Sequence, residues 1–148
     1  MKKEILFGIC ADVHHEEGKD ECWRMKKFVD EARERGCEFI IQLGDFINAN
    51  EAGKRMLDVW NSFPGPRYHV LGNHDTAAQF NKFFADPTDD FYTSRIDGYY
   101  VEGDLSNYYV KFEINGIKYL HIGLEYGPRD AVLEWAGNVA DDNPERIV

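Results

Sequence analysis

Three short apolar runs in the first half of the chain are typical of buried strands. They cover residues 5–11, 39–43 and 68–71, and each is bounded by glycine or polar residues. Gly8 interrupts the first run and Gln42 interrupts the second. Runs of this length suit strands of a parallel sheet that helices cover on both faces.

The segments between these runs carry apolar residues at helical spacing. Residues 20–35 are followed by Gly36, which favours the end of a helix, and residues 51–63 are followed by Pro64-Gly65-Pro66. The predicted order is therefore strand, helix, strand, helix, strand. This order favours parallel strands joined by helical crossovers and an α/β fold class.

The second half of the chain has a different pattern. Residues 107–124 are predicted to form two strands, and residues 130–140 form an amphipathic stretch. Residues 86–106 are rich in Asp, Gly, Thr and Ser and are interpreted as an irregular excursion before the later strands. An aromatic cluster is predicted to lie in the core, and it comprises Phe80, Phe83, Phe84, Phe91 and Tyr92.

Residues with metal-binding side chains follow each of the first three apolar runs. Asp12-Val13-His14 follows the first, Gly44-Asp45 the second and Gly72-Asn73-His74-Asp75 the third. Loops that leave the carboxyl ends of neighbouring parallel strands converge on one crevice. Aspartate and histidine bind divalent transition metals, and an asparagine oxygen adds a neutral ligand. The sequence therefore predicts one shared metal site.

In order and spacing, these segments resemble blocks of the calcineurin-like metallophosphoesterases. The family pattern runs DxH, GD, GNH followed by D or E, a separate His, and GHxH, and this chain shows the first three blocks. DxH or GD alone is a weak signal, but GNHD in register with both is specific. The resemblance implies a β-sandwich of mixed sheets flanked by helices, with residues 1–148 as a single domain.

The resemblance also implies a role for each block residue. Asp45 would bridge two divalent ions of Mn, Fe, Zn or Co, and a hydroxide between the ions would attack the phosphorus atom of a small phosphodiester or phosphomonoester. His74 would not be a ligand but would face the phosphoryl group and protonate the leaving oxygen, and Asp75 would orient its imidazole. The implied metal ligands are Asp12, His14, Asp45 and Asn73.

The carboxyl-terminal blocks of the family pattern do not occur in this sequence. The one later histidine, His121, lies in the apolar run 117–124 and is interpreted as a strand residue. Ile147-Val148 resembles the start of a further buried strand, so we expect a truncated domain whose carboxyl-terminal part is missing. The second ion would keep Asp45 and Asn73 as ligands, which predicts partial metal occupancy and weak or absent hydrolysis.

Several of these residues also have a purely structural interpretation. Asp12 would act as a helix N-cap or loop carboxylate, and Asn73 as a turn residue beside Gly72, but the three blocks together favour the metal site. His15 and His69 match no block and are assigned to structure or solvent. For the whole chain, the alternative to an enzyme is a noncatalytic phosphoesterase-like module that binds a partner or serves as a scaffold.

The composition of the chain limits the kinds of partner that we expect and the cellular compartment in which we expect the protein. The chain has 148 residues, 43% of them hydrophobic, which is enough to bury the core of one domain. A net charge of −10 disfavours nucleic acid as a partner. An odd number of cysteines, a short amino-terminal apolar run and no span long enough for a membrane predict a cytoplasmic protein. Exposed apolar edges of a truncated sheet predict self-association.

Overall fold

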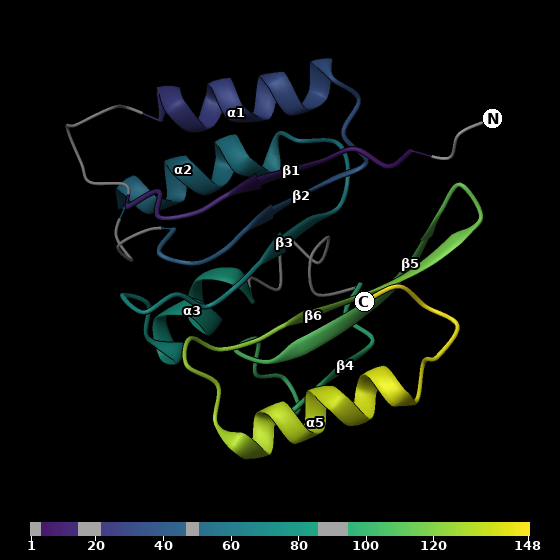
Figure 1. Ribbon diagram of the computed structural model, residues 1–148. Helices are drawn as coiled ribbons and strands as arrows, with labels where there is room; N and C mark the ends of the chain where they lie inside the picture. The colour runs from purple at the N-terminus through teal and green to yellow at the C-terminus, as the bar shows by residue number, and fades with distance from the viewer. Residues whose placement is uncertain (1–3, 15–21, 47–50, 86–94) are drawn as a thin grey trace.

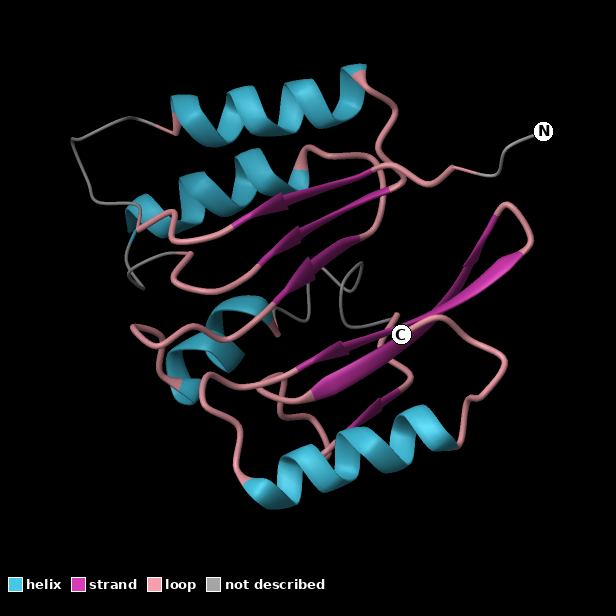
Figure 2. Ribbon diagram, viewed as in Figure 1, coloured by secondary structure: helices cyan, strands magenta, loops and turns pink. Residues whose placement is uncertain are grey.

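Two β-sheets pack face to face between layers of helices. The computed structural model describes residues 4–14, 22–46, 51–85 and 95–148. Helices α1 (Trp23–Glu34) and α2 (Glu51–Asn61) cover the outer face of the first sheet, and α5 (Asp130–Asp141) covers the outer face of the second (Figures 1 and 2). This mixed α/β sandwich confirms the predicted fold class.

The first sheet is parallel and contains the three predicted strands. Its order is β1 (Phe7–Cys10), β2 (Phe39–Gln42) and β3 (Arg67–His69). α1 connects β1 to β2 and α2 connects β2 to β3, which confirms the alternating order predicted from the apolar runs. Because the strands are parallel, their carboxyl ends lie at one edge of the sheet.

The second sheet is antiparallel and follows the order β4 (Gly98–Tyr99), β5 (Tyr108–Ile114) and β6 (Ile117–Gly123). A two-residue turn joins β5 to β6, and both of its residues, Asn115 and Gly116, have positive φ angles of 55° and 76°. Such turns match the twist of a hairpin. The two strands predicted over residues 107–124 are confirmed. β4 lies in the stretch expected to be irregular, of which residues 86–94 are outside the described part.

The apolar runs favoured helices on both faces of the first sheet, and that expectation is wrong, whereas the β-sandwich implied by the resemblance is confirmed. The inner face of the first sheet packs on the second sheet, where the Phe112 ring lies 5.4 Å from the Phe39 ring and 5.9 Å from the Tyr68 ring, between centroids. A continuous apolar run indicates that both faces are covered but does not say by which element. β1 lies at the edge of its sheet and is less buried, since Phe7 and Ile9 are 41% and 51% exposed.

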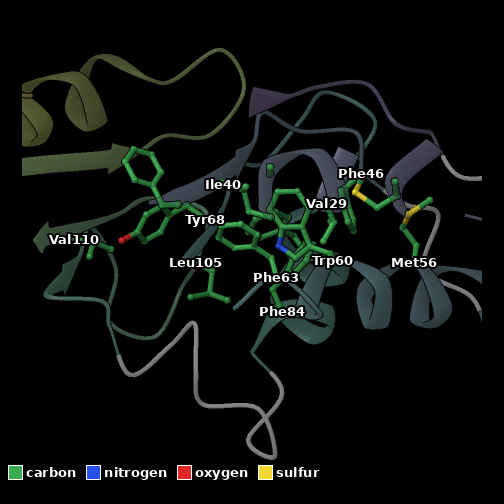
Figure 3. Packing of buried hydrophobic residues seen from close by; sticks show 14 of the residues in the cluster. Val29, Ile40, Phe46, Met56, Trp60, Phe63, Tyr68, Phe84, Leu105 and Val110 are labelled. Carbon is green, nitrogen blue, oxygen red and sulfur yellow. The ribbon is translucent and has the colours of Figure 1, made fainter. Parts of the chain in front are cut away.

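One hydrophobic core runs from α1 and α2 through the first sheet to the second (Figure 3). Trp60 of α2 is fully buried, and its ring lies 5.4 Å from that of Phe46, which is also fully buried. Phe46 follows Asp45 directly in the sequence and also contacts the ring of His69. The core therefore holds one end of a loop that carries a predicted metal ligand.

A short helix, α3 (Ala77–Phe84), follows the third block and was not predicted. Thr76 caps it, because the Thr76 hydroxyl oxygen accepts a hydrogen bond from the Gln79 amide at 3.3 Å. The sequence Thr-x-x-Gln at residues 76–79 is a capping-box pattern, and this pattern could have indicated the start of the helix. Phe80 and Phe84 of this helix are buried as predicted and Phe83 is half-buried, while Phe91 and Tyr92 lie outside the described residues.

The last residues of the chain lie beside β6. Ile147 pairs with Tyr119 in a parallel bridge, in which the Leu120 amide donates to the Ile147 oxygen at 2.8 Å and the Ile147 amide donates to the Lys118 oxygen at 2.9 Å. This pairing has the hydrogen-bond pattern of a strand that runs parallel to β6. Among the described helices, none is long and apolar enough to cross a membrane.

Candidate metal centre

The three loops that carry the predicted site meet at the carboxyl edge of the parallel sheet (Figure 1). The Asp12 amide donates to the Gly44 oxygen at 3.2 Å, and the His14 amide donates to the Asp45 oxygen at 2.9 Å. The second and third loops approach more closely still, since a Cβ atom on Gly44 would lie 2.5 Å from the Gly72 Cα. These contacts require glycine at both positions and bring the loops together as predicted.

Three side chains from these loops gather in one cluster. His14, Asp45 and His74 each offer a ligand atom, and these atoms lie within 4.8 Å of one another. The His14 Nε2 atom is 3.7 Å from an Asp45 carboxylate oxygen and 3.8 Å from an Asp12 carboxylate oxygen. The Asp45 side chain is 4% exposed, whereas that of Asp12 is 73% exposed. The cluster therefore has a buried carboxylate at its base and opens to solvent at Asp12.

His74 lies in this cluster although the resemblance excluded it from the ligand set. Its ring is 5.0 Å from the His14 ring, between centroids, in an edge-on arrangement. At this position His74 would reach an ion held by His14, or a substrate beside such an ion. Asn73 lies on the same loop with an exposed side chain. Its role as a ligand, and the roles of the other block residues, remain predictions.

Asp75 holds the second and third loops to each other. One of its carboxylate oxygens accepts hydrogen bonds from the Asp45 amide at 3.0 Å and from the Gly72 amide at 2.8 Å. Asp45 bonds in the opposite direction, because its Oδ1 atom accepts from the His74 amide at 2.8 Å. Charged acceptors make strong hydrogen bonds to backbone amides. The function of Asp75 in orienting the His74 imidazole remains a prediction.

Three of the predicted ligands have strained backbone conformations. Asp12, His14 and Asp45 have φ angles of 53°, 43° and 54°, in the left-handed region that non-glycine residues rarely adopt. They make up three of the five non-glycine residues with positive φ in the described part of the chain. Each such residue costs about 1–3 kcal/mol, and these residues concentrate at functional sites. The strain supports a functional interpretation of these loops.

The donor atoms of the cluster fit a divalent transition metal. Imidazole nitrogens and carboxylate oxygens bind such ions at about 2.0–2.2 Å, so ligands on opposite sides of one ion are about 4 Å apart. The 4.8 Å span of the cluster is close to this separation. The carboxylates of Asp12, Asp45 and Asp75 also concentrate negative charge at the site, which would repel an anionic phosphoester. Cations would remove that repulsion.

One residue that shapes the site was not recognised as such from the sequence. Gln42, recorded there as an interruption of an apolar run, is fully buried at the end of β2. Its side-chain oxygen accepts from the Gly44 amide at 2.7 Å. The available signal was a polar residue in a buried strand, two positions before a metal-binding block. His69, which was assigned to structure or solvent, is buried in the core.

The fold is an α/β sandwich of two face-to-face sheets. Its candidate metal site lies on loops at the carboxyl edge of the parallel strands. A family model described as calcineurin-like phosphoesterase matches residues 5–146. The chain therefore belongs to the calcineurin-like phosphoesterases, a family of metal-dependent phosphoesterases. This result confirms the resemblance recognised from the three sequence blocks.

Solved structures align with this chain over most of its length. A dimetal phosphatase from Danio rerio aligns with a TM-score of 0.57 and 13% sequence identity, over 95% of this chain and 52% of that one. This chain thus spans about half the length of that structure. A protein of unknown function from Aquifex aeolicus aligns with a TM-score of 0.48 and 15% identity, over 95% of this chain and 75% of that one. No curated protein matches the sequence.

Proposed function

We propose that this chain is a metal-dependent phosphoesterase whose substrate is a small phosphodiester or phosphomonoester. The observation that carries the proposal is the cluster of His14, Asp45 and His74, whose side-chain nitrogen and oxygen atoms lie within 4.8 Å of one another on three separate loops. This spacing brings the proposed general acid His74 beside two of the proposed metal ligands. A scaffold without catalysis has no physical need for a buried carboxylate beside two imidazoles and three strained backbone positions.

The residues proposed to hold two divalent ions are Asp12, His14, Asp45 and Asn73. Asp45 is proposed to contact both ions, and the position of its carboxylate at the buried base of the cluster supports this role. Bound Mn, Fe, Zn or Co ions would neutralise phosphate charge and lower the pKa of a water molecule that attacks phosphorus. The name of the Danio rerio structure, a dimetal phosphatase, agrees with two ions.

His74 is proposed as the general acid. Its backbone amide is fixed by the Asp45 carboxylate, and its side chain is on the exposed side of the cluster. A substrate bound there would present its leaving oxygen to the imidazole, which would donate a proton to it. The backbone hydrogen bonds of Asp45 and Asp75 hold this loop in place, so that the imidazole keeps one position relative to the metal ligands.

Activity is expected to be weak. The proposed ligands of the second ion in this chain are Asp45 and Asn73, and neither is an imidazole. Two neighbouring cations repel each other unless enough anionic and imidazole ligands surround them. Partial occupancy of the second position and slow hydrolysis follow from this ligand set.

Turnover of a chromogenic phosphodiester with added Mn²⁺ tests the proposal, with bound metal measured on the same samples. The His74→Ala variant is expected to keep its Mn²⁺ and to lose about 10²- to 10⁴-fold in turnover, the usual contribution of a general acid. Loss of Mn²⁺ as well would make His74 a ligand. A wild-type chain with neither bound Mn²⁺ nor turnover would contradict the phosphoesterase and leave the noncatalytic module.

An apolar cavity favours self-association, which we propose as a second property. It has a volume of about 250 Å³ and lies between the two sheets, with Phe7, Ile41, Phe112 and Tyr119 among its lining residues. Ile9 of the edge strand β1, two residues after the lining residue Phe7, is 51% exposed. An open strand edge next to apolar surface promotes pairing between chains. The same apolar cavity is also the feature that favours the scaffold alternative, because it offers a binding surface to a partner.

We expect light scattering of the wild-type chain to show dimers or larger species whose proportion rises with concentration. Ile9→Lys should shift the chain towards monomer, because a charge on an edge strand opposes pairing. Val101→Lys is the matched control, since Val101 is 53% exposed and lies outside both sheets. A wild-type chain that stays monomeric at every concentration would contradict this proposal.

A further inference from the structure

The amide side chain of Gln42 occupies a position where an apolar residue would be expected. Gln42 is the last residue of β2, the central strand of the parallel sheet, and it is fully buried. A buried amide is unfavourable unless its polar atoms are hydrogen-bonded. The side-chain oxygen accepts from the Gly44 amide at 2.7 Å, and the side-chain nitrogen donates to the Val70 oxygen at 3.2 Å. Both polar atoms of the amide are therefore satisfied.

These two hydrogen bonds join the second and third loops of the metal centre. Gly44 has a φ angle of 104° and Asp45 one of 54°, and the chain bends as it leaves β2. Val70 lies two residues before Gly72, whose backbone packs against Gly44. One side chain thus fixes the start of the turn that carries Asp45 and the approach to the loop that carries His74.

Gln42 and Asp75 hold consecutive amides of the same turn. Gln42 accepts from the Gly44 amide, and Asp75 accepts from the Asp45 amide at 3.0 Å. Without the Gln42 oxygen, the Gly44 amide would be left without this buried acceptor, and a turn with positive φ angles would lose one of the hydrogen bonds that restrain it. The position of the Asp45 carboxylate relative to His14 depends on that turn.

We propose that Gln42 is a positioning residue of the metal centre, which acts by holding the Gly44-Asp45 turn in the conformation that directs the Asp45 carboxylate towards His14. The inference rests on the proposed function, because it assumes that Asp45 binds metal. An apolar residue would satisfy the burial of β2 equally well, so the amide is explained by the turn and not by the strand.

The test compares Gln42→Met, which keeps the length and burial of the side chain but removes both hydrogen bonds, with Ile40→Val. Ile40 is fully buried on the same strand, and its truncation weakens packing without touching the loops. Mn²⁺ affinity is measured by titration calorimetry, and exchange of the Gly44 amide is measured by NMR without metal.

Gln42→Met is expected to weaken Mn²⁺ binding by about 10- to 100-fold, the usual effect of removing a residue that orients a ligand. The Gly44 amide should exchange at least about tenfold faster than in Ile40→Val. Ile40→Val should lower Tm with unchanged Mn²⁺ affinity, because it removes one buried methyl group and none of the hydrogen bonds of Gln42. If Gln42→Met does not fold, Gln42→Asn replaces it, because its shorter amide cannot reach both partners.

Two failures are distinguishable. If the wild-type chain binds Mn²⁺ and Gln42→Met binds it equally well, this inference is overturned and the proposed function stands. If the wild-type chain binds no Mn²⁺, the proposed function is overturned, and the inference with it.

Discussion

Asp45→Asn is expected to abolish tight binding of divalent metal while the fold stays intact. The Asp45 side chain is 4% exposed, and its Oδ2 atom lies 3.7 Å from His14 Nε2. Its Oδ1 atom accepts from the His74 amide at 2.8 Å, and an asparagine oxygen can accept the same hydrogen bond. The substitution therefore removes the charge without removing the loop contact. Since loss of a residue behind a ligand costs about 10- to 100-fold in affinity, loss of the ligand itself should cost more than about 100-fold.

Thermal unfolding with and without Mn²⁺ separates metal binding from stability. A ligand present at 100 times its Kd stabilises the folded state by about 2.7 kcal/mol, so wild-type Tm should rise with Mn²⁺. In Asp45→Asn that rise should vanish, while Tm without metal should be equal or higher, because a buried charge near Asp12 is removed. Asp58→Asn, on the exposed surface of α2, makes the same charge change and should keep the rise. A Mn²⁺-dependent rise of normal size in Asp45→Asn would contradict the site.

The free energy of unfolding is expected to fall as the pH drops from about 6.5 to 4. Burial lowers the pKa of His121 to about 4. Burial, together with the nearby Arg67 charge, also lowers the pKa of His69 well below its usual value. Unfolded histidine has a pKa of about 6.5, so below that pH the unfolded chain binds protons that the folded chain does not. The stabilisation that the two neutral histidines contribute to the free energy of unfolding is therefore fully present above pH 6.5. For His121, about 3 kcal/mol of that stabilisation is lost by pH 4.

His121→Gln is the variant that isolates this contribution. The Tyr108 hydroxyl donates to the His69 oxygen at 2.9 Å, and the His121 Nε2 atom lies 3.1 Å from the same hydroxyl oxygen. A glutamine amide can donate there without titrating. Urea unfolding at several pH values should show a smaller loss for this variant between pH 6.5 and 4, with His69 supplying the remainder. If the free energy of unfolding of this variant fell with pH as steeply as that of wild type, the result would contradict the contribution of His121 to the pH dependence.

Most strands and helices could be predicted from the sequence, because each depends on residues that are close together in the chain. Strands β1 and β2 coincide with the apolar runs to within two residues at each end, and α1, α2 and α5 coincide with amphipathic stretches. Each such element depends on the spacing of apolar residues along a short window. α3 was missed because it has eight residues, too few for a clear helical period, and its capping Thr76 was not weighed.

The spacing of apolar residues did not predict which element packs against the inner face of the first sheet. The resemblance implied a β-sandwich, but a Phe or Tyr in a strand packs equally well against a helix or against another sheet. The contacts of Phe39 and Tyr68 with Phe112 could therefore not be derived from their positions in the chain. Contacts between residues so far apart in sequence depend on how the two halves of the chain dock. The partial exposure of β1 also depends on how the two halves of the chain dock.

The sequence by itself determined the family, the order of strands and helices in the first half, and the three loops that carry the site. These follow from motif spacing and local periodicity. Tertiary structure alone decided that His74 joins His14 and Asp45 within 4.8 Å, and that the amides of the Gly44-Asp45 turn are held by Gln42 and Asp75. The physical reason is that these contacts join backbone and side-chain atoms of separate loops, whose distances are fixed by the packing of parallel strands and by glycines that let two backbones touch.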